Sequence, residues 1–478
     1  MGRRFLSLDF LRGISIFGMI FSAIVPYGVL PGWMYHVQNP PPTHNLDTSV
    51  CGIGWVDLVF PVFIFCMGAA IPLSGKSKIE KGAGTLGFIK GCLERFVMLW
   101  LFAYLYVLTN FTTVSGVWPQ IFTVLGFCAI AMLYVKVRKG AAAGNNVASG
   151  KRLEWLRWLG AALVVLVIAV GHFCFDEVVS VHRRGIIIFL LAFLYLFGSI
   201  IWYFTRNRVG LRWFVFGLLI LFTYVTKELG WPASTYANPN VRWWFNMEYF
   251  YFLLILLPAT FVGESLAGRN RPAGGDGQNA SNGAATGVAK VLLLDRVLFP
   301  ALLVFVAWQC YALYMNMFAV NLAVSALFVV LVFFVVKRWL GQWRDIFCIA
   351  AVLHLLGLVF IFIESSISKV PCTISYCLVT FGIAVYLLMF SDFLCKALGN
   401  GGFVVQVFSG AGQNPLMSYI AFDNLIVPLM KATGFISLYG AASLPEYPLT
   451  GVLRAAVAVL FTMWFVYLSG KRGFVWRA

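Results

Sequence analysis

Apolar segments of about 20 residues recur along almost the whole chain, and this feature limits its fold more than any other. A helix needs roughly 20 mostly apolar residues to cross the hydrocarbon core of a bilayer. Of the 478 residues, 61% are hydrophobic and 11% are charged, whereas soluble domains carry about 25% charged residues. The sequence therefore predicts an all-α, polytopic integral membrane bundle of about 12 to 14 transmembrane helices.

The predicted spans occupy most of the chain and leave only short connectors. They cover residues 8–30, 55–74, 87–109, 119–136, 157–175, 185–204, 211–226, 246–264, 296–316, 320–336, 346–364, 374–391, 404–430 and 449–470. The one marked break in composition lies at 268–288, which is rich in Gly, Asn, Ala and Ser and is typical of a flexible linker. This cytoplasmic linker is predicted to separate an amino-terminal membrane bundle, 1–267, from a carboxy-terminal one, 289–478.

Lysine and arginine residues indicate how the spans are oriented. The formal net charge is +17, and the connectors near 76–81 and 136–152 are rich in basic residues, whereas 31–54 and 110–118 contain none. The positive-inside rule then predicts two cytoplasmic termini and an outward-facing 31–54 connector. Because the basic residues are scattered over short loops and form no basic domain, no nucleic-acid partner is expected.

The outward connector is where catalytic chemistry is expected. His44 and His36 lie on it, and Asp57 opens the next span. An imidazole titrates near neutral pH, so either histidine can act as a general base or as a nucleophile. Asp57 can orient His44 as the third member of a catalytic triad does, or it can simply favour the helix N-terminus. His44 is the first candidate for the chemistry and His36 is its rival.

Two further places carry polar residues at the edges of spans. Asp9 and Arg12 are spaced to pair across one helical turn, either as a structural ion pair or at a cytoplasmic entrance for a cofactor. The sequence Gly412-Gln413-Asn414-Pro415, with Asp423 and Asn424 beyond it, predicts a broken helix of the kind that lines a cavity. No histidine or cysteine spacing typical of a metal site is present, so no metal is predicted.

Two blocks of this sequence resemble one known family. The first block holds Leu8-Asp9-x-x-Arg12-Gly13, the loop with His44, and Trp55-Val56-Asp57-Leu58-Val59-Phe60-Pro61 with its continuation to Gly68; the second is Gly412-x-Asn414-Pro415-Leu416-x-x-Tyr419. Together they resemble the membrane domain of heparan-α-glucosaminide N-acetyltransferase and its bacterial relatives. The resemblance implies a multi-pass protein of the bacterial inner membrane and a transmembrane acyltransferase with acetyl-CoA as its co-substrate.

The activity implied by the resemblance is transfer of an acetyl group from cytoplasmic acetyl-CoA to an amine or hydroxyl of a sugar or glycan on the outer face. Arg12, Lys90 or Arg95 would lie near the CoA phosphates, with Asp9 at the same entrance. His44 or His36, oriented by Asp57, would deprotonate the acceptor or take the acetyl group. Asn414 would donate a hydrogen bond to the developing oxyanion, a contribution typically of about 3 kcal/mol.

Two other function classes stay open. One is a transporter or flippase for a glycan or small solute, in which Asp9, Asp57 and Asp423 bind substrate or coupling ions and no CoA is consumed. The other is a membrane scaffold that keeps the fold without the activity. The identity of the acceptor and the formation of a homodimer are left open as well.

Overall fold

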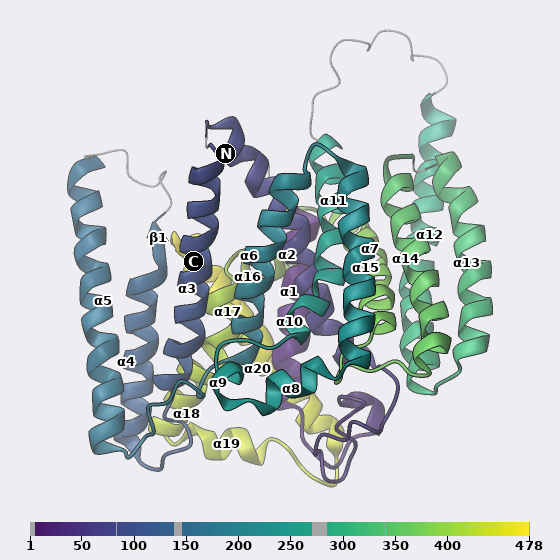
Figure 1. Ribbon diagram of the computed structural model, residues 1–478. Coiled ribbons are helices and arrows are strands. Elements are labelled where there is room, and N and C mark those ends of the chain that lie inside the picture. The colour runs from purple at the N-terminus through teal and green to yellow at the C-terminus, as the bar shows by residue number, and fades with distance from the viewer. Residues whose placement is uncertain (1–4, 83, 138–145, 270–283, 340, 478) are drawn as a thin grey trace. The chain divides into compact units, whose positions relative to one another are not determined.

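The computed structural model describes residues 5–82, 84–137, 146–269, 284–339 and 341–477. Its long helices are α1 (Leu6–Ile24), α2 (Trp55–Glu80), α3 (Thr85–Leu108), α4 (Val117–Tyr134), α5 (Asn146–Cys174), α6 (Ile186–Thr205), α7 (Val209–Glu228), α11 (Leu253–Arg269), α12 (Ala284–Tyr314), α13 (Phe318–Trp339), α14 (Gly341–Glu364), α15 (Ile374–Ala397) and α20 (Pro448–Lys471) (Figure 1).

The remaining elements are short. They are the single-turn helix η1 (Gly32–Met34), α8 (Trp231–Ala237), α9 (Pro239–Arg242), α10 (Glu248–Tyr251), α16 (Phe403–Gln413), α17 (Pro415–Ala421), the π-helical turn η2 (Phe422–Ile426), α18 (Val427–Ala432), α19 (Phe435–Ala441), and the strands β1 (Val135–Val137) and β2 (Phe474–Trp476). The strands pair antiparallel, with Lys136 opposite Val475.

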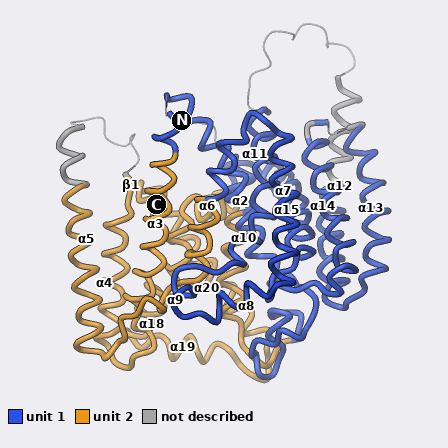
Figure 2. The backbone as a smooth tube through the Cα atoms, viewed as in Figure 1, with its two compact units in different colours: residues 1–11, 31–88, 197–402 blue, residues 12–30, 89–196, 403–478 orange. Residues whose placement is uncertain are grey.

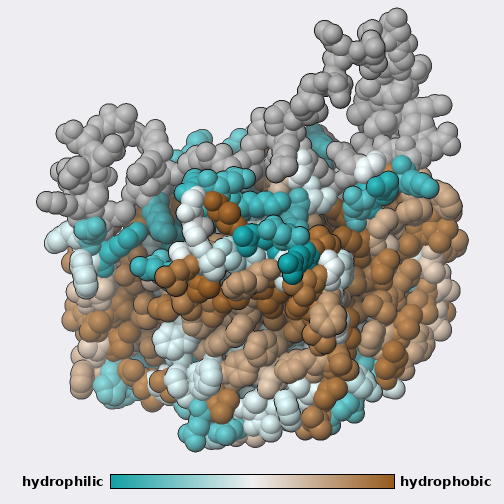
Figure 3. Space-filling view, turned by 45° about the horizontal axis from the view of Figure 1, so that its top comes forward, coloured by the Kyte–Doolittle hydropathy of each residue, from teal (hydrophilic) through white to brown (hydrophobic). Residues whose placement is uncertain are grey.

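The predicted all-α polytopic bundle is confirmed. Within the described residues, 13 helices are long and apolar enough to cross a membrane, or 14 if one bent pair counts as a span. That pair runs from Pro415 to Ala432 and from Phe435 to Ala441 with a bend of 106°. On the face drawn in Figure 3, hydrophobic side chains cover much of the surface and hydrophilic ones gather towards its margins, as lipid contact requires. The protein is a multi-pass membrane protein.

The chain forms two compact units that interleave along the sequence (Figure 2). Unit 1 comprises residues 1–11, 31–88 and 197–402, and unit 2 comprises residues 12–30, 89–196 and 403–478. These units differ from the predicted division into 1–267 and 289–478, because unit 1 takes helices from both sides of the predicted linker. Most of that linker, 270–283, lies outside the described residues.

Unit 1 is built around α15, in which every residue from Ile374 to Tyr386 is buried. α15 packs on α14, and α2 packs on α11. Glycines allow the helix backbones to approach closely: a Cβ added to Gly68 of α2 would lie 2.5 Å from the carbonyl oxygen of Leu256 in α11. Small residues at such positions are the usual way in which membrane helices pack without side-chain clashes.

Unit 2 brings together the first and the last parts of the chain. Its α16 packs on α20, and α4 packs on both α5 and α18. A Cβ added to Gly13 of α1 would lie 2.0 Å from the carbonyl oxygen of Phe408 in α16, so these two helices also cross at a glycine. Residues 12–30 and 403–478 therefore form one packed structure, although most of the chain separates them.

Candidate active site

Asp57 lies in the first turn of α2, where its carboxylate closes the start of the helix. Its Oδ2 atom accepts hydrogen bonds from the backbone N–H groups of Gly54, at 3.1 Å, and Val37, at 3.3 Å. A carboxylate at the third helical residue that accepts from the N-cap backbone is one half of a capping box. The side chain is only 4% exposed, and a buried carboxylate needs such donors to remain charged.

His36 is the third partner of this carboxylate. Its Nδ1 atom lies 2.6 Å from Asp57 Oδ1. Because a carboxylate only accepts hydrogen bonds, Nδ1 carries the proton and Nε2 of the neutral ring keeps its lone pair. The His36 side chain is 38% exposed, and within the described part of the chain Nε2 makes no hydrogen bond. A buried carboxylate thus orients an accessible imidazole nitrogen, as in a catalytic dyad.

In the structure, Asp57 pairs with His36 and not with His44. The sequence predicts His44 as the first candidate for the partner of Asp57, yet His36 makes the hydrogen bond. His44 adopts a left-handed backbone conformation, with φ of 52°, and its ring lies edge-on to that of Tyr35 with centroids 4.5 Å apart. The reason is local: the single turn of η1 brings His36 and the Val37 N–H to the same carboxylate. No sequence spacing could distinguish the two histidines.

A connector that is distant in sequence completes the surroundings of this pair. Residues 365–373 join α14 to α15. The side-chain amide of Gln38 makes two hydrogen bonds to the backbone of Val370 in this connector. Gln38 Nε2 donates to the Val370 carbonyl at 2.5 Å, and Gln38 Oε1 accepts from the Val370 N–H at 2.9 Å. The hydroxyl of Tyr376 donates to the backbone carbonyl of Asp57 at 2.8 Å. Tyr376 and Lys369 carry no sequence signal, because only tertiary packing brings them near Asp57.

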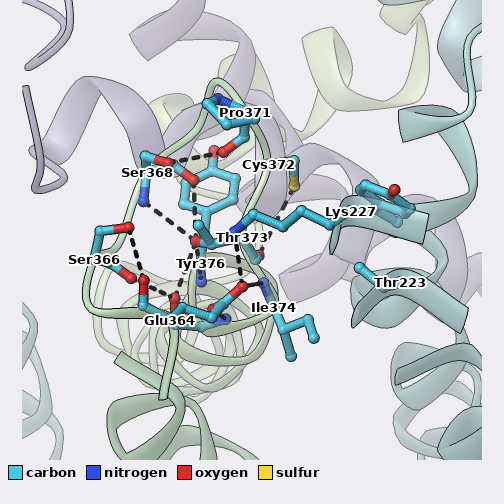
Figure 4. A network of polar contacts seen from close by, with 12 residues as sticks. Thr223, Lys227, Glu364, Ser366, Ser368, Pro371, Cys372, Thr373, Ile374 and Tyr376 are labelled. Carbon is cyan, nitrogen blue, oxygen red and sulfur yellow. Dashed lines mark hydrogen bonds and ion pairs between the residues drawn. The ribbon is translucent and has the colours of Figure 1, made fainter. Parts of the chain in front are cut away.

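A polar network fixes the ends of this connector (Figure 4). Glu364, the last residue of α14, accepts from the backbone N–H groups of Ile374 at 3.0 Å and Ser375 at 2.9 Å, and from Lys227 Nζ at 3.1 Å. Thr373 caps α15 by accepting from the Tyr376 N–H at 3.1 Å. The glutamate therefore occupies the N-terminus of α15, where a negative charge is stabilised. These bonds tie the end of α14 to the start of α15, on either side of the connector.

The broken helix at Gly412-Gln413-Asn414-Pro415 lies in unit 2, where it contacts Arg12 of α1. Arg12 of α1 donates from Nη1 to the carbonyl of Gly412, at 3.0 Å. That carbonyl belongs to the last turn of α16, before the chain breaks at Asn414 and Pro415. Carbonyls at a helix C-terminus lack intrahelical partners, so the guanidinium satisfies one of them. The predicted broken helix is present, and Arg12 stabilises the break.

Asn414 has partners that differ from its predicted role. Its Nδ2 atom donates to the carbonyl of Phe474, at 3.2 Å, and to Met417 Sδ, at 3.3 Å, while its Oδ1 accepts from the Trp476 N–H at 3.0 Å. The side chain is 1% exposed. An oxyanion donor needs an amide hydrogen directed at substrate, whereas both hydrogens of this amide bind the protein itself. Asn414 anchors β2.

The residues predicted to bind the donor fall mainly in unit 2. Arg12, Lys90 and Arg95 belong to unit 2, whereas Asp9 belongs to unit 1, where it is buried on α1. Lys90 is exposed. Arg95 lies over the ring of Tyr195 at 4.2 Å from its centroid, a cation–π contact. Two of these residues, Arg12 and Arg95, therefore also have structural contacts, while Lys90 presents its charge to the surroundings.

The broken helix also carries a polar cluster. Asp423 and Asn424 lie on the π-helical turn η2, and such turns occur frequently at functional sites. Asn424 Nδ2 donates to the Tyr106 carbonyl at 2.8 Å and its Oδ1 accepts from Asn110 at 3.3 Å. Across the described ranges, no group of three or more His, Cys, Asp or Glu side chains is arranged to hold a metal ion.

Comparison with known sequences assigns a family. The sequence model of a domain of unknown function, DUF5009, matches residues 4–266, which is more than half of the chain. The chain belongs to the DUF5009 family. The match includes His36, Asp57 and Arg12 but ends before Lys369 and Asn414. A search of curated proteins finds no match to this chain.

Proposed function

We propose that this protein is a membrane acyltransferase that moves an acetyl group from cytoplasmic acetyl-CoA to an amine or hydroxyl of a sugar on the outer face. The observation that carries the proposal is the His36–Asp57 pair, in which a buried carboxylate holds a half-exposed imidazole at 2.6 Å. An imidazole held in this way is suited to acyl transfer. The connector that bears it, 31–54, contains no lysine or arginine, as an outward loop would.

In the proposed reaction, the His36–Asp57 pair carries out the proton transfer. Asp57 keeps the proton on Nδ1 and stabilises the imidazolium that forms when Nε2 takes a proton from the acceptor. The acceptor nitrogen or oxygen then bonds to the acetyl carbon, the thioester C–S bond breaks, and the CoA sulfur leaves with that proton. In the alternative order, Nε2 attacks the acetyl carbon, the thioester C–S bond breaks and CoA leaves as its thiolate. The acceptor then attacks the acetyl carbon, the bond to Nε2 breaks, and the proton that the acceptor loses matches the one that the CoA thiolate takes up. Lys90, with Arg12 and Arg95, would attract the CoA phosphates.

The proposal places the protein in the bacterial inner membrane with both termini in the cytoplasm. The first motif block supports this assignment by its resemblance to heparan-α-glucosaminide N-acetyltransferase. It begins at the predicted cytoplasmic end of α1, and it contains both Arg12 and Asp57. The donor would therefore arrive from the side of Arg12, whereas the acceptor would meet His36.

The two histidines of one connector provide a matched test. Purified protein in liposomes is incubated with acetyl-CoA and glucosamine, and release of CoA and of acetylated sugar is measured for His36→Ala and His44→Ala. We expect His36→Ala to lose about a hundred- to ten-thousandfold in rate and His44→Ala to stay within about threefold of the wild type. Equal rates for wild type and His36→Ala would overturn the proposal. Sugar uptake without CoA release would favour the transporter instead.

A further inference from the structure

Lys369 is a lysine beside the His36–Asp57 pair that the proposed chemistry does not use. It lies on the 365–373 connector, immediately before the residue gripped by Gln38. Within the described ranges, its ammonium makes no hydrogen bond and no ion pair at contact distance, although the Asp57 carboxylate acts on it electrostatically. A lysine without such a partner, on a connector that is hydrogen-bonded to the connector of His36, requires an explanation.

The surroundings of Lys369 leave its charge poorly compensated. Burial lowers the pKa of Lys369, and the nearby carboxylate of Asp57 only partly opposes that effect. Asp57 cannot approach the ammonium more closely without loss, because Oδ1 is bound to His36 and Oδ2 to two backbone N–H groups. Lys369 is half-buried, and an ammonium partly removed from water without a close counter-ion is stabilised by any anion that reaches it.

The connector holds this lysine in place. Besides the two bonds from Gln38, the backbone N–H of Gly52 donates to the carbonyl of Ile367, at 2.8 Å. On its other side, Ser368 and Thr373 bond to each other through backbone and side chain at 3.1 and 3.2 Å. The segment that carries Lys369 is thus tied at two points to the connector that carries His36. A binding group supported in this way needs little ordering when a ligand arrives.

We propose that Lys369 binds an anionic group of the acceptor, so that the substrate is an acidic amino sugar bearing a carboxylate, sulfate or phosphate. The inference rests on the proposed function, since it names the class of acceptor for the same site. The ammonium would pair with the anion while His36 Nε2 faces the amine or hydroxyl to be acetylated. Lysine suits this task because it is a compact charge with three donors.

The test measures acceptor binding separately from turnover. We titrate three probes that carry an anionic group into the wild type, Lys369→Met and Lys369→Arg, and measure binding by calorimetry. The probes are muramic acid, glucosamine 6-sulfate and glucosamine 6-phosphate. Glucosamine, which has no anionic group, is the reference. Lys396→Met is the matched control, because it removes the same charge from the other end of α15, where Lys396 is 61% exposed. Thermal unfolding of each variant shows whether it folds.

We expect at least one anionic probe to bind the wild type more tightly than glucosamine, and Lys369→Met to weaken that binding about ten- to a hundredfold. Lys369→Arg should recover part of the loss, and neither Lys369→Met nor Lys396→Met should change glucosamine binding. Which probe binds distinguishes the carboxylate, sulfate and phosphate alternatives. Equal affinity for all four sugars, no binding of any anionic probe, or an equal loss for glucosamine in Lys369→Met would overturn the inference.

Turnover in the same samples separates this inference from the proposed function. Anion-dependent binding that needs Lys369, without any CoA release, would keep the anion site and reject the acyltransferase. Acetyl transfer that is equally efficient with glucosamine and the anionic sugars, and unchanged in KM by Lys369→Met, would keep the acyltransferase and reject the anion site. If Lys369→Met fails to fold, the comparison of probes on the wild type and Lys369→Arg decides the matter.

Discussion

The His36–Asp57 site and the Arg12–Asn414 region both belong to the sequence motifs identified above, but the hydrogen-bond partners of their side chains differ. In unit 1, the buried carboxylate orients an imidazole whose Nε2 has no hydrogen bond among the described residues. In unit 2, the Asn414 amide is fully bonded to neighbouring backbone and sulfur atoms, and Arg12 supports the end of α16. Polar residues in a membrane protein can therefore leave a nitrogen atom without a protein partner in one motif and bond entirely to the protein in another, and only the structure shows which.

The largest expected effect comes from breaking the orienting carboxylate. Asp57→Asn should lower acetyl transfer about a hundred- to ten-thousandfold, because an amide cannot stabilise the imidazolium and can hold the ring in the wrong tautomer. Asn retains an oxygen that can accept from Gly54, so the start of α2 should persist. The measurement is the rate of CoA release, with thermal unfolding as the control. A rate near that of the wild type would remove Asp57 from the chemistry.

The next effect concerns architecture in unit 2. Gly13→Ala should destabilise the protein by about 3 kcal/mol or more, because the new Cβ would meet the Phe408 carbonyl at 2.0 Å and backbone cannot yield easily. Gly87→Ala is the matched control, since nothing lies within 4 Å of a Cβ at that helical position. Yield and thermal stability in detergent are compared. Similar behaviour of both variants would contradict the close crossing of α1 and α16.

Substitution of Asn414 should lower stability and leave activity nearly unchanged, whereas substitution of Asp57 should lower activity and leave the fold intact. Asn414→Ala removes the partners of the Phe474 carbonyl and the Trp476 N–H, so it should cost about 2 kcal/mol of stability. Activity per folded molecule should remain within about threefold. Asn414→Asp can still accept from Trp476 but sets a buried carboxylate oxygen against the Phe474 carbonyl, so it should unfold at or below the temperature of Asn414→Ala. A large loss of kcat in a variant of normal stability would return Asn414 to a catalytic role.

The smallest perturbation tests which side of the membrane holds the His36 connector. A membrane-impermeant maleimide added outside intact cells should label Cys51, which is half-buried on that connector. Cys372 should resist labelling, because it is fully buried and burial raises the pKa of its thiol, so little reactive thiolate forms. Labelling of Cys51 that required permeabilised cells would reverse the predicted orientation and undermine the transmembrane transfer.

Local patterns were enough to predict the helices but not their assembly. Hydropathy located nearly every long helix, and the helix breaker at Pro415 correctly predicted the interruption between α16 and α17. The predicted span 246–264 includes α10, but no prediction covers the short helices α8 and α9 or the β1–β2 pair, because three- to seven-residue elements depend on tertiary contacts rather than on periodicity. The interleaving of the two units was missed for the same reason.

At the candidate site, the sequence singles out one connector and both of its histidines, but it favours His44 as the partner of Asp57, whereas the structure pairs Asp57 with His36. Asp57, His36 and Arg12 were all named, since charges near apolar spans are conspicuous. Choosing between His36 and His44 depended on one turn of backbone at η1, which no spacing rule describes. Lys369 and Gln38 carry no local signal, because their roles arise from contacts across more than 300 residues of sequence.

The interleaved units also have a consequence for how the protein is made. Unit 2 begins with residues 12–30 but needs 403–478 to finish, and its strand β2 lies almost at the end of the chain. A ribosome adding roughly 5 to 20 residues per second needs on the order of 20 to 75 seconds to cross the intervening sequence. The part of α1 that belongs to unit 2 must therefore stay in the membrane without its α16 contact until residues 403–413 have been made, so a premature stop before residue 403 would leave this early segment without that partner.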